Sequence, residues 1–267
     1  MPVELNGSRV LLTGATGGLG HAIARCLHAR GAHLILTGRR AEVLDELRTE
    51  LGDRVETKPL DLSDAGAVHR FAAEAGQIDV LVANAGLPGT GQLADYSSEQ
   101  IDRVIDVNLR SPVHLTHALV PGMLERGRGH VVYISSISGK VATAHSSLYN
   151  ATKFGLRGFS FAIHEDLRGT GVGATTVFPG VVADAGMWAD GGLDLPKGVK
   201  ASKPEAVAEA VITGIEKDKP EINVANPIER LGGVLAGPAP RLVSFINRHA
   251  GTNELAEALA KRQVEKR

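Results

Sequence analysis

The stretch RVLLTGATGGLG at residues 9–20 joins a short apolar run to a turn that carries four glycines in seven positions. The run at 9–13 is typical of a buried β-strand, and a helical pattern begins near residue 20. Glycines allow the backbone to turn sharply and to approach a ligand closely. A helix that follows such a turn directs free N–H groups and the positive end of its dipole at a phosphate. The stretch therefore predicts a strand–turn–helix unit for a dinucleotide, and a purely structural turn is the alternative.

The same alternation of apolar runs and helical patterns continues along the chain. The runs are continuous, which indicates strands buried on both faces, and strands separated by helices form parallel sheets. The predicted fold class is therefore α/β, a doubly wound Rossmann-like parallel sheet of about seven strands with helices on both faces. The expected strands are 9–13, 33–37, 55–60, 79–83, 130–135, 172–178 and 222–225. The expected helices are 20–30, 41–51, 65–75, 98–125, 148–169 and 202–217, the last with a capping box of Ser202 and Glu205.

Composition excludes several classes of partner and site. The 267 residues carry a formal net charge of -1 and 4 % aromatics, so no nucleic-acid surface is expected. The single cysteine, Cys26, fits a reducing compartment and is expected to be a plain core thiol. The sequence shows neither a signal peptide nor an apolar run of about 20 residues, so we expect a cytoplasmic protein without a transmembrane segment. No His, Cys and Asp cluster has metal-ligand spacing, and no metal is expected.

Polar and glycine residues follow six successive predicted strands. The carboxyl ends of parallel strands meet at one edge of the sheet, where open α/β sheets bind ligands. This co-location is the strongest argument for a binding site that the residues themselves provide. The residues are Gly14, Thr16, Gly18, Leu19 and Gly20, then Arg39 and Arg40, Asp61 and Leu62, Asn84, Ala85 and Gly86, Ser135, Ser136 and Ser138, and finally Pro179 and Gly180.

The residues after the second strand indicate which dinucleotide binds. An acidic side chain about 20 residues past the glycines would bind the ribose 2′-hydroxyl of NAD. The chain has Gly38 there, followed by Arg39 and Arg40, whose guanidinium groups suit a 2′-phosphate. NADP is therefore favoured, while NAD stays possible and the arginines could instead be a solvated helix start. Asp61 could accept a hydrogen bond from adenine or cap the following helix.

Tyr149 and Lys153 are spaced to lie on one face of a helix, with Ser136 upstream. An ammonium beside a phenol favours the phenolate, so the pKa of the tyrosine would fall. Such a phenol can exchange a proton with an alcohol or a carbonyl oxygen. The pair is weak evidence alone, and the glycine turn on the same chain strengthens it.

Taken in order, these motifs resemble the short-chain dehydrogenase/reductase family in its compact single-domain form, over about residues 7–225. The resemblance rests on the Thr-Gly-x-x-x-Gly-x-Gly turn at residues 13–20, Asn84-Ala85-Gly86, Asn108, Ser136, Tyr149-x-x-x-Lys153 and Pro179-Gly180. It implies a catalytic dinucleotide-binding domain at 1–226 and a C-terminal helical extension of that domain at 227–267. It also implies a homodimer or homotetramer formed through helices near 102–125 and 148–169.

The resemblance also implies a role for each matched residue. Tyr149 would be the general acid/base, Lys153 would bind the nicotinamide ribose and favour the tyrosinate, and Ser136 would hydrogen-bond the substrate carbonyl. Asn108 would hold a helix kink and a proton-relaying water. The cofactor side would be lined by Asn84 and Gly86, with Val182 and the neighbouring valine at the carboxamide end. The family often has Thr where this chain has Asp184, which puts the cofactor contacts there in question.

The sequence therefore predicts an NADP-preferring oxidoreductase that transfers hydride between nicotinamide and an alcohol/carbonyl pair. An isomerase or lyase on the same fold and a non-catalytic NADP-sensing regulator are the alternatives. A flap at 183–201, with Met187, Trp188, Leu193 and Leu195, suggests an apolar substrate. The tail stripe of Leu242, Phe245 and Ile246 could pack on the catalytic domain, form a subunit interface or contact a membrane surface.

Overall fold

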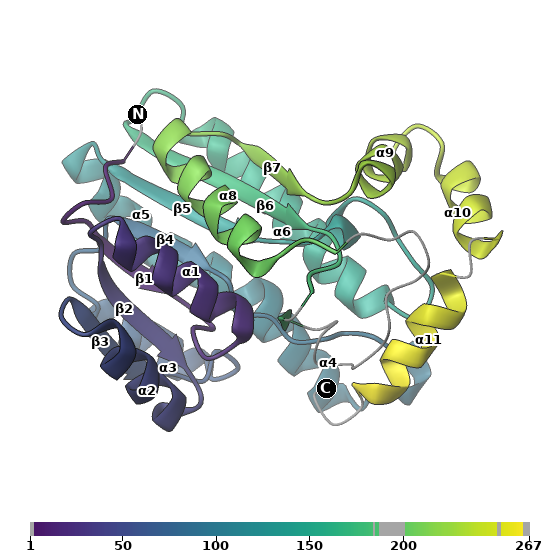
Figure 1. Cartoon of the computed structure of the whole chain (residues 1–267), viewed down its shortest axis with the longest axis horizontal. Coiled ribbons are helices and arrows are strands. Elements are labelled where there is room, and N and C mark those ends of the chain that lie inside the picture. The colour runs from purple at the N-terminus through teal and green to yellow at the C-terminus, as the bar shows by residue number, and fades with distance from the viewer. Residues whose placement is uncertain (1–2, 184, 187–200, 250–251, 264–267) are drawn as a thin grey trace.

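The computed structural model describes residues 3–183, 185–186, 201–249 and 252–263, and within them seven strands form one parallel sheet in the order β3-β2-β1-β4-β5-β6-β7 (Figure 1). The strands are β1 Arg9–Leu12, β2 His33–Gly38, β3 Val55–Pro59, β4 Val80–Ala83, β5 Gly129–Ile134, β6 Val172–Pro179 and β7 Glu221–Val224. Their order runs outward in both directions from β1 and β4, which confirms the doubly wound Rossmann-like sheet and its seven expected strands.

Both faces of the sheet are buried because the strands are apolar at odd and at even positions. In β1, Val10 and Leu12 belong to one core cluster, whereas Leu11 belongs to the other. Successive side chains of a strand point to opposite faces, so a continuous apolar run provides two cores. The first core lies under α1 and α8, and the second lies under α3, α5 and α6.

The helices follow the expected ranges with a few differences. They are α1 Gly18–Ala29, α2 Ala41–Leu51, α3 Ala65–Glu74, α4 Ser98–Ile105, α5 Ser111–Arg126, α6 Ser147–Asp166, α8 Pro204–Lys217, α9 Pro227–Leu235, α10 Pro240–His249 and α11 Thr252–Arg262. Cys26 of α1 is half-buried rather than a plain core thiol, because its Sγ donates to Glu209 Oε1 of α8 at 3.2 Å. Burial and this bond raise the pKa of Cys26 to about 12, so it remains a thiol.

The helix expected at 98–125 forms without a break, as α4, a π-helical segment at Asp106–Arg110 and α5. The π-helical segment contains Asn108, where the resemblance implied a kink, and Asn108 Oδ1 there accepts from the N–H of Leu87. One local prediction was wrong. The capping box of Ser202 and Glu205 does not form. The N-cap of α8 is Lys203, and Ser202 Oγ donates instead to the carbonyl of Val224 at 3.3 Å.

The tail forms three helices beyond the carboxyl edge of the sheet (Figure 1). A capping box of Asn226 and Glu229, which sequence inspection missed, begins α9. The stripe of Leu242, Phe245 and Ile246 on α10 is 51 %, 52 % and 49 % exposed. The stripe is thus about half covered, with Ile246 at the wall of the cavity described below.

Candidate active site

A cavity of about 1390 Å³ lies at the carboxyl edge of the sheet and brings the predicted residues together. Its lining includes Gly14, Thr16, Gly18, Leu19, Gly20, Arg39, Arg40, Asp61, Leu62, Asn84, Ala85, Gly86, Ser136, Tyr149, Lys153, Pro179, Gly180 and Val182. Asn108 is the exception, because it lies fully buried behind this wall. Tyr149 and Lys153 lie in α6, and the other lining residues named follow the ends of six strands, as expected of ligand sites in open parallel sheets.

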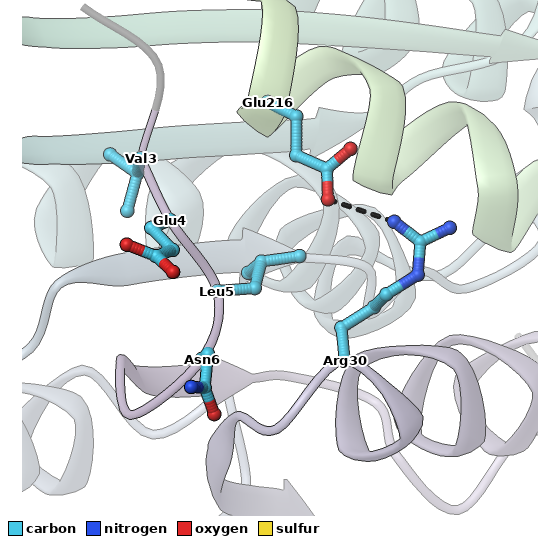
Figure 2. A pocket seen from close by; sticks show the side chains of 6 residues that line it. All are labelled: Val3, Glu4, Leu5, Asn6, Arg30 and Glu216. Atoms are coloured by element: carbon cyan, nitrogen blue, oxygen red, sulfur yellow. Dashed lines mark hydrogen bonds and ion pairs between the residues drawn. The ribbon is translucent and has the colours of Figure 1, made fainter.

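A second pocket, of about 410 Å³, contains none of the predicted residues. It is lined by residues 3–6 and by the ion pair in which Arg30 Nη1 lies 2.8 Å from Glu216 Oε1 (Figure 2). Residues 3–6 precede β1, so this pocket lies at the opposite end of the strand from the glycine turn. We therefore assign the ligand site to the larger cavity.

The glycine turn is held against the end of β4. Gly14 has a φ of +65°, and a Cβ there would lie 2.7 Å from the Cα of Ala85. Thr13 fixes this approach, because its Oγ1 accepts the backbone N–H groups of Asn84 and Ala85, each at 3.1 Å. The Asn84 side chain donates in return to the carbonyls of Thr13 and Gly14. The role of Thr13 was not recognised in the sequence, although its place at the end of a strand was a signal.

The end of β2 carries positive charge where NAD-type sites carry an acidic side chain. A Cβ on Gly38 would lie 2.7 Å from Thr16 Cγ2, so Thr16 occupies the space of a larger side chain. Arg39 and Arg40 are both exposed at the cavity. Arg40 donates to the carbonyl of Thr16, whereas the Arg39 side chain makes no hydrogen bond or ion pair to the described residues and is exposed to solvent. This arrangement can receive a phosphate at the adenosine end of a dinucleotide.

Asp61 lies at the end of β3 and is not the cap of the following helix. Its Oδ1 accepts from the N–H of Ser63 at 2.9 Å and from the Ser63 hydroxyl at 2.7 Å. Asp64 caps α3 instead by accepting from the N–H of Ala67. Asp61 is therefore held at the cavity wall, where the adenine interpretation remains open.

Tyr149 and Lys153 lie in one helical turn of α6, and the Lys153 Nζ is 5.6 Å from the centre of the Tyr149 ring. Burial raises the pKa of Tyr149 to about 12, against a smaller opposing effect of the Ser136 hydroxyl. This direction is opposite to the predicted one, because burial disfavours the phenolate more than the neighbouring groups favour it. Burial also lowers the pKa of Lys153 to about 8, and its Nζ donates to the carbonyl of Ile134 at 2.9 Å. Without a ligand, the tyrosine is thus a proton donor.

Asn108 joins three parts of the site. Its Oδ1 accepts from the N–H of Leu87 at 2.7 Å, and its Nδ2 donates to the Leu87 carbonyl at 3.0 Å and to Thr152 Oγ1 at 3.3 Å. The loop after β4, the π-helical segment and α6 are therefore tied at one side chain. A π-helical turn often marks a functional site, because it displaces one residue from the regular ladder.

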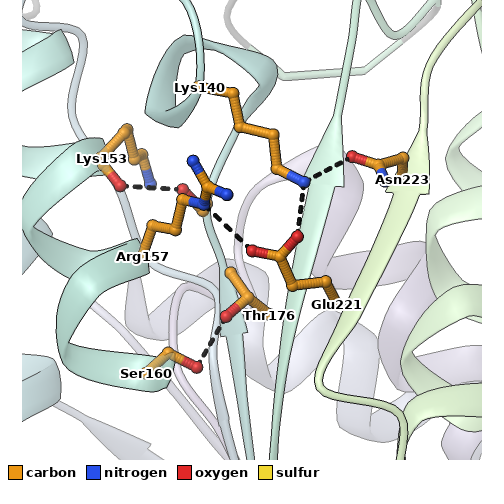
Figure 3. Close-up of polar contacts among 8 residues, drawn as sticks. Lys140, Lys153, Arg157, Ser160, Thr176, Glu221 and Asn223 are labelled. Carbon is orange, nitrogen blue, oxygen red and sulfur yellow. Dashed lines mark hydrogen bonds and ion pairs between the residues drawn. The ribbon is translucent and has the colours of Figure 1, made fainter. Parts of the chain in front are cut away.

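A charged cluster supports the segment that carries Ser136. Lys140 Nζ lies 2.7 Å from Glu221 Oε2 and donates to Asn223 Oδ1 at 3.0 Å, and Arg157 Nε lies 3.0 Å from Glu221 Oε1 (Figure 3). Burial would raise the pKa of Glu221, but the hydrogen bonds from the two cations outweigh it and the pKa falls. The cluster connects β7, α6 and the 3₁₀ turn after β5, and so it holds the segment that follows Ser136 against the sheet.

The segment after β6 is tied at both ends. Val182 pairs with Ser202 as a parallel bridge, in which Ala183 N donates to the Ser202 carbonyl at 2.9 Å and Ser202 N donates to the Val181 carbonyl at 2.8 Å. Glu229 of α9 accepts from the N–H of Val181 at 3.3 Å. Asp184 and the apolar flap side chains at 187–195 lie outside the described residues, so the structure does not test those predictions.

The tail helices form the far wall of the cavity, which the sequence did not predict. Val243, Ile246 and Leu259 line it with Ile137 and Val141. At the rim, Thr90 Oγ1 donates to Gln263 Oε1 at 2.8 Å in a buried contact. No local pattern could reveal a contact between residues so far apart, although the helical stripe of α10 was a partial signal. Among the described residues, no cluster of three or more His, Cys, Asp or Glu side chains could hold a metal ion, and no helix is long and apolar enough to cross a bilayer.

Comparison with known proteins agrees with this geometry. The family model of the short chain dehydrogenases matches residues 8–193. The chain is 37 % identical over 232 residues to the ketoacyl reductase HetN of Nostoc sp., which covers 84 % of this chain and 81 % of that protein. It is 42 % identical over 178 residues to the NADP-dependent 3-hydroxy acid dehydrogenase YdfG of Salmonella typhi, which covers 65 % and 72 %.

A solved structure of similar form extends the comparison to a bound cofactor. The closed form of serine dehydrogenase complexed with NADP+ superposes with a TM-score of 0.71 and 36 % identity, over 81 % of this chain and 93 % of that chain. This chain therefore belongs to the short-chain dehydrogenase/reductase family.

Proposed function

We propose that this protein is an NADPH-dependent reductase of ketones, acting on an alcohol/carbonyl pair carried by an apolar substrate. The observation that carries the proposal is the convergence of Ser136, Tyr149 and Lys153 on the same cavity as the glycine turn and Arg39. Ser136, Tyr149 and Lys153 are the residues that a reductase needs for proton transfer, and the glycine turn and Arg39 are those that the cofactor needs for binding.

The residues present fit an NADP molecule. The positive φ and close approach at Gly14 leave a backbone surface without a Cβ, and the start of α1 presents free N–H groups to a pyrophosphate. Arg39 would bind the 2′-phosphate, and Arg40 would support it from its bond to Thr16. Bound NADPH supplies the hydride. NADP complexes of related proteins support this choice of cofactor.

The side chains then perform the proton chemistry. The Tyr149 phenol, with its pKa raised to about 12, holds its proton until a carbonyl oxygen gains negative charge, and then transfers it to that oxygen. The Ser136 hydroxyl donates a hydrogen bond to the same oxygen and stabilises that charge. Lys153 lies beside Tyr149 and stabilises the phenolate left after the transfer. Through its hydrogen bond to Thr152, Asn108 holds α6, and with it Tyr149, in a fixed position relative to the cofactor side of the cavity.

The apolar wall of α10 and α11 supports an apolar substrate. Val243, Ile246 and Leu259 face the cavity across from Ile137 and Val141, and burying each substrate methylene there would contribute about 0.8 kcal/mol. The names of the relatives, a ketoacyl reductase and a 3-hydroxy acid dehydrogenase, are consistent with a 3-oxo compound.

Two measurements test the proposal. NADPH and NADH are titrated separately, and we expect tighter NADPH binding that Arg39→Ala weakens about tenfold or more while NADH binding is unchanged. Net NADPH oxidation is then followed with 3-oxo esters of increasing chain length. Catalytic efficiency should rise with chain length, and equal efficiency on short hydrophilic and long apolar ketones would exclude the apolar substrate.

The catalytic assignment has its own test. Tyr149→Phe should lower turnover by about 10²-fold or more while the dissociation constant of NADPH changes only a few-fold. A product formed without net NADPH consumption would favour the isomerase or lyase alternative. Tight NADPH binding without turnover of any carbonyl compound would favour the regulator.

We also propose that the protein is a cytoplasmic homo-oligomer assembled through α5 and α6. Leu124, Phe154 and Phe161 are 41 %, 41 % and 51 % exposed on these helices, which supports burial against a second copy. Light scattering at micromolar concentration tests this assembly, and a monomer there would contradict it.

A further inference from the structure

Six apolar side chains of α9 and α10 form an exposed face, here called the tail surface. They are Ile228, Leu231, Val234, Leu242, Phe245 and Ile246, with exposed fractions from 49 % to 79 %. Within the described part of the chain, ten large apolar side chains have exposed fractions of 41 % or more, and six of these ten form the tail surface. Exposed apolar patches of this kind mark interaction sites on soluble domains.

The apolar stripes of both helices lie at the surface beside the cavity and not in the core. In α9 no residue is buried, and exposed apolar residues recur every third position. In α10 Val243 is buried, whereas Leu242, Phe245 and Ile246 are about half exposed. A surface helix ordinarily packs its apolar stripe on the core, so both stripes are left partly uncovered. Figure 1 shows α9 and α10 standing off the end of the sheet.

The tail surface is also positively charged. Residues 230–249 contain Arg230, Arg241 and Arg248 but no Asp or Glu, in a chain whose net charge is -1. All three arginines are exposed, and none forms an ion pair with a described carboxylate. Arg230 donates to the carbonyls of Ala225 and Asn223, so Arg241 and Arg248 are the cations left for headgroups. Glu229 is the acidic residue of α9, and its carboxylate turns inward to the N–H groups of Val181 and Asn226.

We infer that the tail surface docks on an anionic lipid bilayer, with the apolar stripes in the interface and the arginines at the headgroups. An apolar stripe flanked by cations is the pattern of helices that lie in a membrane interface. Each arginine near an anionic bilayer contributes attraction that a neutral surface lacks. A second copy of this chain fits less well, because a contact between two tail surfaces would bring two faces of the same positive charge together.

In the docked protein, the mouth of the cavity would face the lipid. Ile228 and Ile246 belong to the tail surface and also line the cavity. The inference concerns binding alone and does not rest on the proposed reaction, so failure of one leaves the other standing.

Vesicle flotation of the full chain tests the inference. We expect binding to vesicles of phosphatidylcholine with about one-third phosphatidylserine, and much weaker binding to phosphatidylcholine alone. Leu242→Ser should weaken binding about tenfold, whereas Leu93→Ser, at a site of similar exposure (55 %), should leave it unchanged.

A charge-matched pair completes the design. Arg241→Gln with Arg248→Gln should weaken binding about thirtyfold, or about fivefold for each arginine. Lys217→Gln with Lys219→Gln removes the same charge next to β7 and should have little effect. The inference is overturned if the wild-type chain does not float with the anionic vesicles, or if both charge pairs weaken binding equally. It is also overturned if Leu242→Ser lowers the mass in light scattering, since a second copy then covers the tail surface.

Discussion

Replacing Thr13 by valine tests whether this one hydroxyl fixes the glycine turn. The side chain is 2 % exposed, and its Oγ1 accepts from the N–H groups of Asn84 and Ala85. Valine has nearly the same shape but cannot accept. The Asn84 N–H keeps a second acceptor, the carbonyl of Val82 at 3.1 Å, whereas the Ala85 N–H has no other described acceptor. One buried N–H is thus left without a partner and a second is weakened, which costs about 2 kcal/mol within a range of about 1–3 kcal/mol.

The measurement is urea unfolding of the cofactor-free protein, with Thr37→Val as the matched control. Thr37 is as buried as Thr13 and ends the neighbouring strand, but its hydroxyl makes only a long 3.5 Å bond to the carbonyl of Leu12. Thr13→Val should therefore shift the midpoint clearly more than Thr37→Val. It should also weaken NADPH binding, because Ala85 contacts Gly14. Equal shifts in the two variants would refute the role given to this hydroxyl.

Three further predictions concern buried polar groups. Burial lowers the pKa of His130 to about 3, so the unfolded chain binds a proton below about pH 6.5 that the folded chain binds only near pH 3. Because of this residue, the free energy of unfolding should fall by about 2 kcal/mol from about pH 7.5 to about pH 5. Urea unfolding at the two pH values should show that His130→Leu lacks this decrease, whereas the exposed control His33→Leu retains it. Asn108→Leu should cost about 2–4 kcal/mol in the same assay, because the N–H and C=O of Leu87 lose their partner; an unchanged midpoint would contradict this. The dissociation constant of NADPH should rise above about pH 8, where Lys153 loses its proton, and titration of Lys153→Met should show no such rise.

The sheet and the cofactor side of the site could be predicted because their signals are local. An apolar run such as residues 9–13 indicates a strand buried on both faces, and a parallel sheet then places every residue after such a run at one edge. Gly14, Arg39, Asn84 and Pro179 were located by this rule alone, without knowledge of any contact. The order of the strands was not needed, since all carboxyl ends share the edge.

Contacts set by three-dimensional packing could not be predicted. The pKa of Tyr149 was expected to fall because Lys153 is near in sequence, but burial of the phenol depends on elements that the sequence does not place. Likewise, Ser202 has the spacing of a cap, but the end of β7 offers its hydroxyl a different acceptor. The half-exposed stripe of α10 has the same periodicity as a fully packed one, so the periodicity alone cannot tell how much of the stripe is covered.

The parallel bridge between Val182 and Ser202 has a consequence for engineering this fold. It brings the two ends of the intervening stretch together beside the sheet, because Ser202 Oγ also donates to the carbonyl of Val224. In chain-entropy terms, doubling the length of a closed loop costs only about 0.6 kcal/mol. Ala185 lies within the stretch and packs in the core next to Gly18, so an exchanged stretch has to keep a small residue there. With that residue kept, we expect that stretches of different length can be exchanged between Val182 and Ser202 while the cofactor edge keeps its position.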